Sequence, residues 1–187
     1  RKISPKIEKW VKANKQLSTQ VKNLSLAWIK EGLKPRCITR DLKAGIKVPI
    51  KGYEHYVWYV WAENAIGYIS STQEWHKTKW KKFWQGPNAK IYYFVGKDNI
   101  PFHSIFFPGE LLAHGGYNLP YNVVGLQYLN YEGGKFSKSK NRGVFCENLK
   151  SANLDSDYWR FYLAYLIPET RDTEFQWAEF KNRINSE

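Results

Sequence analysis

The stretch Gly133-Gly134-Lys135-Phe136-Ser137-Lys138-Ser139-Lys140-Asn141-Arg142-Gly143 decides how the rest of the sequence is interpreted. Glycines stand at both ends, so the backbone there can adopt conformations that other residues avoid. Between them lie four cations, two hydroxyls, one amide and one aromatic ring, without an acidic group. These side chains suit a mobile loop that closes over a polyphosphate. A solvated basic hairpin is the alternative that composition alone favours.

The chain is basic and rich in side chains that form a core. Of its 187 residues, 43% are hydrophobic and 17% aromatic, which predicts a folded domain and not a disordered chain. The sequence holds 29 Lys and Arg against 17 acids, for a formal net charge of +12. A domain this basic indicates a polyanionic partner, with nucleic acid favoured over phosphorylated metabolites and an anionic membrane.

The sequence points to a cytoplasmic protein. No run approaches the ~20 apolar residues that span a bilayer, so no membrane is expected as a partner. The chain begins at Arg1 without a Met, a signal peptide or a transit segment, and we interpret it as a processed product or a fragment. Cys37 and Cys146 form no Cys-x-x-Cys pair and are expected to be reduced thiols. The four histidines lack close metal-ligand spacing, so no metal site is expected.

Two amphipathic helices are expected to open the chain. Ser4-Pro5 predicts the start of the first, because Pro is favoured in a first helical turn. The second is expected between Ser18 and Gly32, where apolar residues recur with helical spacing. Residues 76–84 interleave four lysines with three aromatics, which suits either a nucleic-acid surface or an amphipathic helix. The amphipathic helix is favoured, with three rings facing the core: Trp80, Phe83 and Trp84.

Three runs of β-branched and aromatic residues are predicted to be strands: 56–61, 90–95 and 122–131. The first two are expected to be buried. The first is also expected to feed directly into a helix over residues 62–69, which is half of a βαβ unit. Ligands bind at the carboxyl ends of the strands in such sheets. Trp61 and Tyr68 lie at this junction, where a core position is the commoner explanation of an aromatic residue.

The turn after the second strand is another candidate ligand site. Gly96 allows a ligand to approach closely, and Asp98 can accept a hydrogen bond from a ribose or an ammonium group. Pro101 fits the first turn of the helix that follows. His103 lies on that helix, where a lone histidine is more often a core residue than a functional one.

Two more helices are expected near the C-terminus. Ser156 is expected to cap the first of them, which Pro168 ends. Thr173 and Gln176 are expected to form a capping box for the last helix.

Several segments together resemble one family. Lys135-Phe136-Ser137-Lys138-Ser139 resembles the KMSKS signature of class I aminoacyl-tRNA synthetases, with Phe136 in the place of Met. Three segments agree in kind and order with the methionyl-tRNA synthetase family: 59–68 (YVWAENAIGY), 96–104 (GKDNIPFHS) and 128–139 (YLNYEGGKFSKS). The resemblance runs from about residue 18 to the C-terminus, and residues 32–41 resemble archaeal and eukaryotic cytosolic members.

The resemblance implies an α/β fold: the second half of a Rossmann-type class I synthetase catalytic domain, followed by the start of an α-helical domain. Residues 1–44 would hold the end of an inserted connective region and its return helix. Residues 45–150 would form the second half of the catalytic domain, with the KFSKS loop. Residues 151–187 would form a helical stem-contact region and the start of the anticodon-binding domain.

The resemblance also implies an activity. The family activates methionine with ATP to methionyl-adenylate and transfers the methionyl group to tRNA(Met), so methionine, ATP with Mg²⁺, and tRNA(Met) are the expected substrates. The His-Ile-Gly-His signature and the zinc-binding insertion appear nowhere in these residues. The missing N-terminal half of the enzyme is therefore a further expected partner, and the segment alone is expected to be inactive. The alternative is a non-catalytic tRNA- or RNA-binding module derived from the same fold.

By matching position, the resemblance implies roles for individual residues. Lys138 would be the principal cation on the leaving pyrophosphate, with Lys135 supporting it, and Arg40 would order the active site through a carboxylate. The adenosine side of the ATP site would be lined by Gly96, Asp98 and Leu129. A methionine pocket with aromatic walls and one Tyr or His donor would be formed by Trp61, Ala65, Tyr68 and His103. Three places depart from the family pattern: Asn64, Phe107 and Lys140-Asn141-Arg142.

Overall fold

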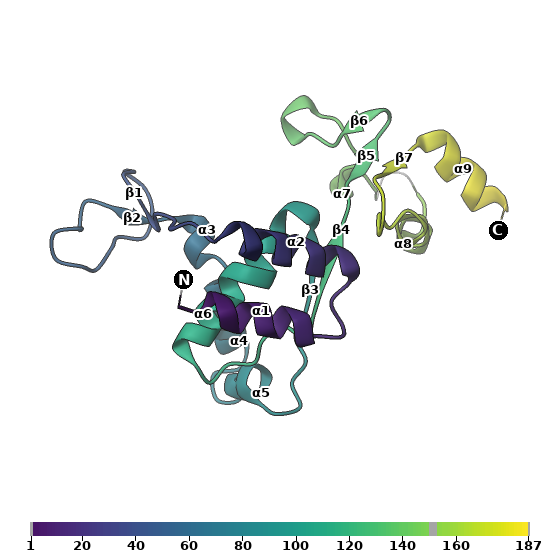
Figure 1. The fold of residues 1–187 in the computed structure, drawn as a ribbon. Helices are drawn as coiled ribbons and strands as arrows, with labels where there is room; N and C mark the ends of the chain where they lie inside the picture. The colour runs from purple at the N-terminus through teal and green to yellow at the C-terminus, as the bar shows by residue number, and fades with distance from the viewer. Residues whose placement is uncertain (1, 150–152, 187) are drawn as a thin grey trace. The chain divides into compact units, whose positions relative to one another are not determined.

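The computed structural model describes residues 2–149 and 153–186 (Figure 1). The chain divides into two compact units, Arg1–Val124 and Gly125–Glu187. The domain boundaries predicted after residues 44 and 150 stay predictions. Across the described ranges, no helix combines the length and the apolar character needed to cross a membrane.

The first unit opens with the predicted pair of helices. α1 (Ser4–Ala13) and α2 (Thr19–Glu31) pack against each other. Pro5 lies in the first turn of α1, where its missing N–H leaves no hydrogen bond unmade. The Ser18 hydroxyl accepts from the Val21 N–H at 3.3 Å and caps α2, which ends before Gly32 as expected.

The rest of the first unit mixes short helices with short strands. In chain order these are β1 (Thr39–Arg40), β2 (Val57–Trp58), α3 (Val60–Glu63), α4 (Ile66–Trp75), α5 (Trp80–Gln85), β3 (Tyr92–Gly96), a 3₁₀ turn (Lys97–Asn99), a π-helical turn (Phe102–Phe106), α6 (Phe107–His114) and β4 (Asn122–Leu126). An apolar cluster that includes Val21, Tyr93, Phe107 and Val123 lies at their centre. Residues of α2, β3, α6 and β4 therefore share one core.

The strand predicted over residues 56–61 was wrong in length and in pairing. β2 has two residues and pairs antiparallel with β1, Thr39 opposite Trp58 and Arg40 opposite Val57. The chain turns helical at Val60, so the aromatic run is divided between a hairpin and α3. Figure 1 shows this hairpin projecting from the helices of the first unit. It is therefore not the first strand of a βαβ unit.

The second predicted strand and the helix after it are present. β3 and β4 form a two-stranded sheet. β3 is buried on one face: Tyr93 is 7% exposed, whereas its neighbours Tyr92 and Phe94 are 50% and 72% exposed. The prediction of a buried strand was therefore wrong for these alternate positions. The helix begins beyond the 3₁₀ turn, with Pro101 in its first turn as expected.

The strand predicted over residues 122–131 was also wrong, because it is two strands in different sheets. β4 ends at Leu126, and β5 covers Leu129–Tyr131. Between them the Gln127 N–H donates to the Pro168 carbonyl at 2.7 Å. The chain thus changes its hydrogen-bonding partners at this point, which ends one ladder and starts the next.

The second unit is built around β5. Its other elements are β6 (Gly134–Lys135), a 3₁₀ turn (Lys138–Lys140), α7 (Cys146–Leu149), α8 (Ser156–Tyr165), β7 (Thr173–Phe175) and α9 (Trp177–Ser186). β5 pairs antiparallel with β6 and parallel with β7. The core is an aromatic cluster in which Trp159 stacks on Phe180 with ring centroids 4.5 Å apart.

Both capping predictions for the second unit were wrong. Ser156 is the first residue of α8, and Asp155 is its cap, accepting from the Asp157 N–H at 2.9 Å. Thr173 lies in β7, where its hydroxyl donates to the Leu166 carbonyl at 2.6 Å, so it forms no capping box with Gln176. The first N–H of α9 is satisfied by a carboxylate from a distant part of the chain, described below.

Residues 76–84 mostly follow the amphipathic prediction. α5 covers Trp80–Gln85, Trp84 is buried, and Trp80 packs against the core. Phe83 was wrongly placed in the core: it is 44% exposed and its ring lies 5.5 Å from that of Trp75.

Candidate active site

The predicted methionine-pocket residues lie in the first unit, and two of them make direct contact. The Tyr68 hydroxyl is 3.0 Å from Nε2 of His103. Trp61 lies on the neighbouring α3, with its ring 5.1 Å from Phe102, the residue before His103. Ala65 is 8% exposed and belongs to the core, directly before α4. Helices α3 and α4 and the π-helical turn therefore bring these side chains to one region of the unit.

Tyr68 and Trp61 are not core residues. Their side chains are 43% and 42% exposed, whereas His103 is 7% exposed. The core explanation of the two aromatics was therefore wrong, while His103 is buried as a lone helical histidine commonly is. Two partly exposed rings next to a buried histidine are suited to forming the wall of a ligand site.

The proton positions in this pair follow from the chemistry of the partners. Nδ1 of His103 lies 2.9 Å from the carbonyl oxygen of Asn99, which can accept only, so Nδ1 carries the hydrogen. Burial lowers the pKa of His103, and the Asn99 carbonyl opposes this shift. In the neutral ring Nε2 has a free lone pair and accepts from the Tyr68 hydroxyl. Each of these two side chains thus donates its one proton to another protein group.

This arrangement changes the expected chemistry of the pocket. The sequence predicted a Tyr or His donor for a thioether. The hydroxyl proton of Tyr68 and the Nδ1 proton of His103 are, however, already donated to other protein groups. A side chain that needs a strong donor would not find one on Tyr68 or His103, and a buried polar group left unsatisfied costs about 1–3 kcal/mol. A thioether is a weak acceptor and loses little.

A π-helical turn carries His103. π-helical turns are rare and occur frequently at functional sites. Here Phe102–Phe106 forms the turn, and the buried Ser104 hydroxyl donates to the Ile100 carbonyl. The Ser25 hydroxyl of α2 lies 2.8 Å from that of Ser104. These bonds hold the turn that orients the histidine.

Sequence reasoning missed two residues of this region. Tyr93 is packed between the others, with its ring centroid 4.9 Å from His103 and 5.4 Å from Tyr68. Burial raises the pKa of Tyr93, so its hydroxyl stays neutral. Asn99 contributes only a backbone carbonyl, which no side-chain pattern can reveal. Alternation along residues 90–95 was the signal that could have placed Tyr93 on the inner face.

We expect the stability of the chain to depend on pH through His103. The unfolded chain takes up a proton at the ordinary histidine pKa of about 6.5, and the folded chain does so at a lower pH. The free energy of unfolding should therefore fall as the pH falls below about 6.5, with a slope of at most about 1.4 kcal/mol per pH unit. Urea unfolding at pH 5–8 measures this dependence. A His103→Phe variant with the same dependence would contradict the assignment.

The residues predicted to line the adenosine side lie in both units. Gly96 ends β3 in an ordinary extended conformation, and a Cβ atom added there would meet nothing within 4 Å. Asp98 is exposed in the 3₁₀ turn two residues later. Leu129 lies in the second unit as the first residue of β5, partly buried against the aromatic core. The space beside Gly96 is thus open to a ligand.

The basic loop, residues 133–143, is folded in a defined way. Gly133 and Gly143 have φ of +78° and +151°, which confirms that the ends of the loop need glycine. Ser137 and Arg142 exchange two backbone hydrogen bonds of 2.8 and 2.9 Å. The Arg142 guanidinium donates to the carbonyls of Tyr131 and Glu132 at 2.9 and 2.6 Å. Arg142, at a position that departs from the family pattern, therefore closes the loop onto its own base.

The loop cations differ in their surroundings. Lys135 is exposed in β6, and its ammonium group lies 5.3 Å from the centroid of the Tyr128 ring. Lys138 and Lys140 are exposed in the 3₁₀ turn. Neither forms an ion pair within the described ranges. Both ammonium groups are thus accessible to an anion from solution.

Arg40 does not show the predicted contact with a carboxylate. Its guanidinium donates to the carbonyls of Cys37 and Thr39 at 3.0 and 2.8 Å and lies 3.7 Å from the centroid of the Tyr59 ring. Among the residues described, these are backbone and aromatic partners and not acidic ones. The role of Arg40 in the active site stays a prediction.

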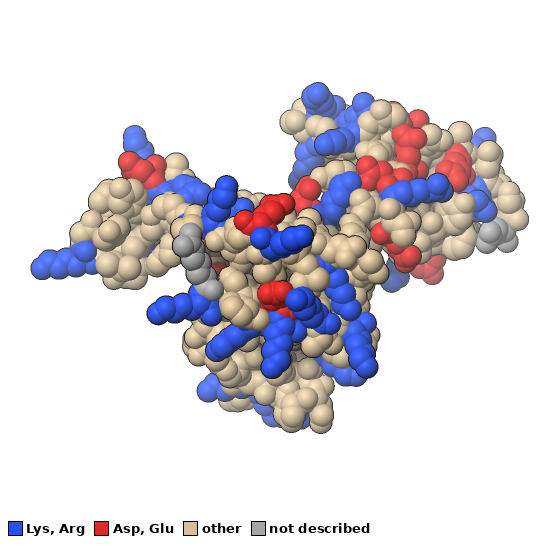
Figure 2. Space-filling view, viewed as in Figure 1, with Lys and Arg blue, Asp and Glu red and all other residues tan. Residues whose placement is uncertain are grey.

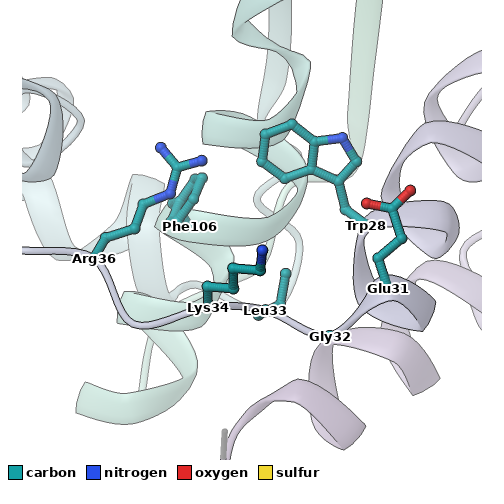
Figure 3. A pocket seen from close by; sticks show the side chains of 7 residues that line it. All are labelled: Trp28, Glu31, Gly32, Leu33, Lys34, Arg36 and Phe106. Carbon is teal, nitrogen blue, oxygen red and sulfur yellow. The ribbon is translucent and has the colours of Figure 1, made fainter.

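A hollow of about 340 Å³ elsewhere in the first unit was not predicted. Figure 3 shows the Arg36 guanidinium beside the Phe106 ring, with Trp28 across from them. The guanidinium carbon is 4.9 Å from the centroid of Phe106 and 5.6 Å from that of Trp28. Arg36 therefore packs on two rings at the edge of this hollow.

The face of the first unit that Figure 2 shows is basic. Figure 2 shows Lys and Arg side chains spread over the face in view, with few acidic side chains between them.

Cys37 and Cys146 are both free and exposed. The part of the chain that is described contains no cluster of three or more His, Cys, Asp or Glu side chains that could hold a metal ion.

The fold and these residues define a class I tRNA synthetase domain. A family model described as "tRNA synthetases class I (M)" matches residues 1–187, and the chain belongs to this family. Its relatives include methionine–tRNA ligases of Sulfurisphaera tokodaii, 49% identical over 99% of the chain, and Pyrobaculum calidifontis, 48% identical over 99%. The cytoplasmic methionine–tRNA ligase of Xenopus laevis is 44% identical over the whole chain. The resemblance to the methionyl-tRNA synthetase family is thereby confirmed.

Solved structures agree with this assignment of the fold. The chain is similar to Mycobacterium tuberculosis methionyl-tRNA synthetase bound by methionyl-adenylate, with a TM-score of 0.80 and 23% identity over 99% of this chain and 36% of that one. The predicted Rossmann-type α/β class is confirmed by this likeness. The chain spans about a third of the length of the two archaeal relatives, 33% in each case, and 21% of the Xenopus ligase.

Proposed function

We propose that this chain is part of a methionine–tRNA ligase, which activates methionine with ATP and transfers it to tRNA(Met). The observation that carries the proposal is the Asn99–His103–Tyr68 hydrogen-bond chain, at residues that match the family segments. It leaves a site with aromatic walls and no uncommitted donor on Tyr68 or His103. Such a site suits a thioether, which is a weak acceptor and needs no strong donor from these two residues. Trp61 and Ala65 are proposed to complete the methionine pocket.

Adenylate formation requires charge stabilisation more than acid–base chemistry. A carboxylate oxygen of methionine attacks the α-phosphorus of ATP, and the bond from that phosphorus to the pyrophosphate oxygen breaks. Negative charge grows on the departing pyrophosphate, where Lys138 is proposed to act, supported by Lys135. Their exposed ammonium groups on a glycine-bounded loop suit this role. Mg²⁺ is proposed to arrive with ATP, held by the phosphates.

The remaining contacts follow from the same proposal. The open space beside Gly96 accommodates the nucleotide, and Asp98 accepts from the ribose hydroxyls. Leu129 contributes an apolar contact to the adenosine side, and Arg40 is proposed to order the site through a carboxylate. In the second step a hydroxyl of the terminal tRNA ribose attacks the methionyl carbonyl, and AMP leaves. The basic face of the first unit in Figure 2 suits the tRNA partner.

Charging of tRNA tests the proposal. The protein, in the full length that its gene encodes, should attach methionine to tRNA(Met) in the presence of ATP and Mg²⁺. Leucine, glutamine and norleucine serve as competitors, of which norleucine should compete best because its side chain is also apolar and unbranched. Preference for another amino acid would contradict the pocket assignment. Tight tRNA binding without any charging would favour a non-catalytic RNA-binding module instead.

A further inference from the structure

The base of the basic loop is joined to the start of α9. A carboxylate oxygen of Glu132 accepts from the Trp177 N–H at 2.7 Å, and the Glu174 carboxylate accepts from the Gly133 N–H. The Trp177 indole donates to the Tyr131 hydroxyl at 2.8 Å. These bonds run in both directions between residues 131–133 and 174–177, so they fix the two segments against each other.

Glu132 is the residue on which these contacts converge. Its N–H donates to the Phe175 carbonyl at 3.1 Å, and its own carbonyl accepts from the Arg142 guanidinium. Its side chain, as described above, caps α9. Glu132 also has φ of +43°, a left-handed conformation that is unfavourable for a residue with a side chain. Such a conformation persists only where the surroundings hold it, and here both the loop and α9 do so.

The contact with α9 is favourable for electrostatic reasons. The first N–H groups of a helix lack partners within the helix, and the N-terminus carries a partial positive charge. A carboxylate that accepts from the first N–H of α9 satisfies one of these groups and interacts with that charge. The base of the loop is thereby tied to the N-terminus of a ten-residue helix.

We propose that Glu132 is a positioning residue: through its side-chain bond to α9 it fixes the base of the basic loop and so sets where Lys135 and Lys138 stand. Lys135 lies three residues after Glu132, in β6. There it pairs with Asn130 of β5, the strand that ends at Tyr131. A displaced base would therefore displace the strand that leads into the 3₁₀ turn of Lys138. The proposal rests on the proposed function, because it requires these lysines to act on a phosphate.

Pyrophosphate exchange by three variants of the full-length protein tests this role. Glu132→Ala removes the acceptor, and Glu132→Gly removes it while suiting the positive φ, which covers the case of a poorly folded alanine variant. Both should lower kcat about 10- to 100-fold without changing the KM for methionine, because misplaced groups lose rate steeply. Glu132→Gln keeps a carbonyl oxygen for Trp177 and should stay within about 3-fold of the unaltered protein. Glu169→Ala, an exposed carboxylate of the same unit, is the matched control.

A double-mutant cycle and hydrogen exchange distinguish positioning from simple stability. In a Lys138→Ala background, Glu132→Gly should add much less to the loss of rate than it does alone, because both act through one group. Amide hydrogen exchange over residues 133–143 should be faster in Glu132→Gly than in Glu132→Gln, and this readout does not depend on activity. Equal exchange rates, or full additivity of the two substitutions, would overturn the proposal. If the unaltered protein showed no pyrophosphate exchange, the proposed function would be refuted. The amide exchange rates of the Glu132 variants would still show whether Glu132 fixes the base of the loop.

Discussion

The Lys138→Ala variant is expected to form methionyl-adenylate about 10²- to 10³-fold more slowly than the unaltered protein, with methionine affinity nearly unchanged. A cation that acts on charge developing in the transition state contributes there and little in the ground state. Removing one well-placed group of this kind costs about 3–4 kcal/mol of transition-state stabilisation. Single-turnover adenylate formation and equilibrium methionine binding measure the two quantities separately.

Lys140→Ala is the matched control for this prediction. Lys140 lies in the same 3₁₀ turn, is also exposed, and differs from Lys138 in its position along the turn. Its loss should change the rate by less than about 3-fold, since general charge on an exposed surface contributes little. Equal losses from the two substitutions would mean that the loop acts by net charge alone. A Lys138→Ala variant with normal exchange would remove the loop from the mechanism.

Tyr68→Ala is expected to raise the KM for methionine about 10- to 100-fold and to leave the KM for ATP nearly unchanged. The ring is 43% exposed, so it has surface available for a ligand to cover, and losing an apolar wall of this size costs about 1.5–3 kcal/mol. Tyr68→Phe keeps the wall but leaves Nε2 of His103 without its donor. The smaller loss expected there is about 5- to 10-fold, the value of one hydrogen bond.

Tyr92→Ala is the corresponding control. Tyr92 is half exposed on β3, its ring contacts Tyr121, and it lies next to Tyr93 in sequence. Steady-state kinetics of all three variants should show a methionine-specific defect only in the Tyr68 variants. An equal increase in both KM values for Tyr68→Ala would mean that this tyrosine supports the fold and not the ligand.

The parts of the fold that the sequence predicted correctly depend on local contacts. Ser18 caps α2 through the N–H three residues later, and Gly133 and Gly143 allow the turns of the loop next to them. A window of a few residues contains both partners of such an interaction, so the pattern is visible in the sequence. The family match of the basic loop is likewise a short contiguous signal.

The parts that the sequence did not predict depend on distant partners. The N-terminus of α9 is capped by Glu132, 45 residues earlier, so the local Thr173–Gln176 pattern was misleading. β2 pairs antiparallel with Thr39 and Arg40 and not with a parallel strand, a partner that its own residues do not reveal. In the candidate site, the tautomer of His103 is set by a backbone carbonyl of Asn99. A helix cap from a distant residue and a backbone acceptor both leave the local pattern of residue types unchanged.

Methionine-dependent exchange of pyrophosphate into ATP tests the central claim most directly. The assay reports the first half-reaction alone and requires neither tRNA nor its recognition. The full-length protein is predicted to exchange pyrophosphate in the presence of methionine and Mg²⁺, and to show background exchange when methionine is omitted or replaced by glutamine. Exchange that is absent, or that another amino acid supports better than methionine, would contradict the assignment of this chain to a methionine-activating enzyme.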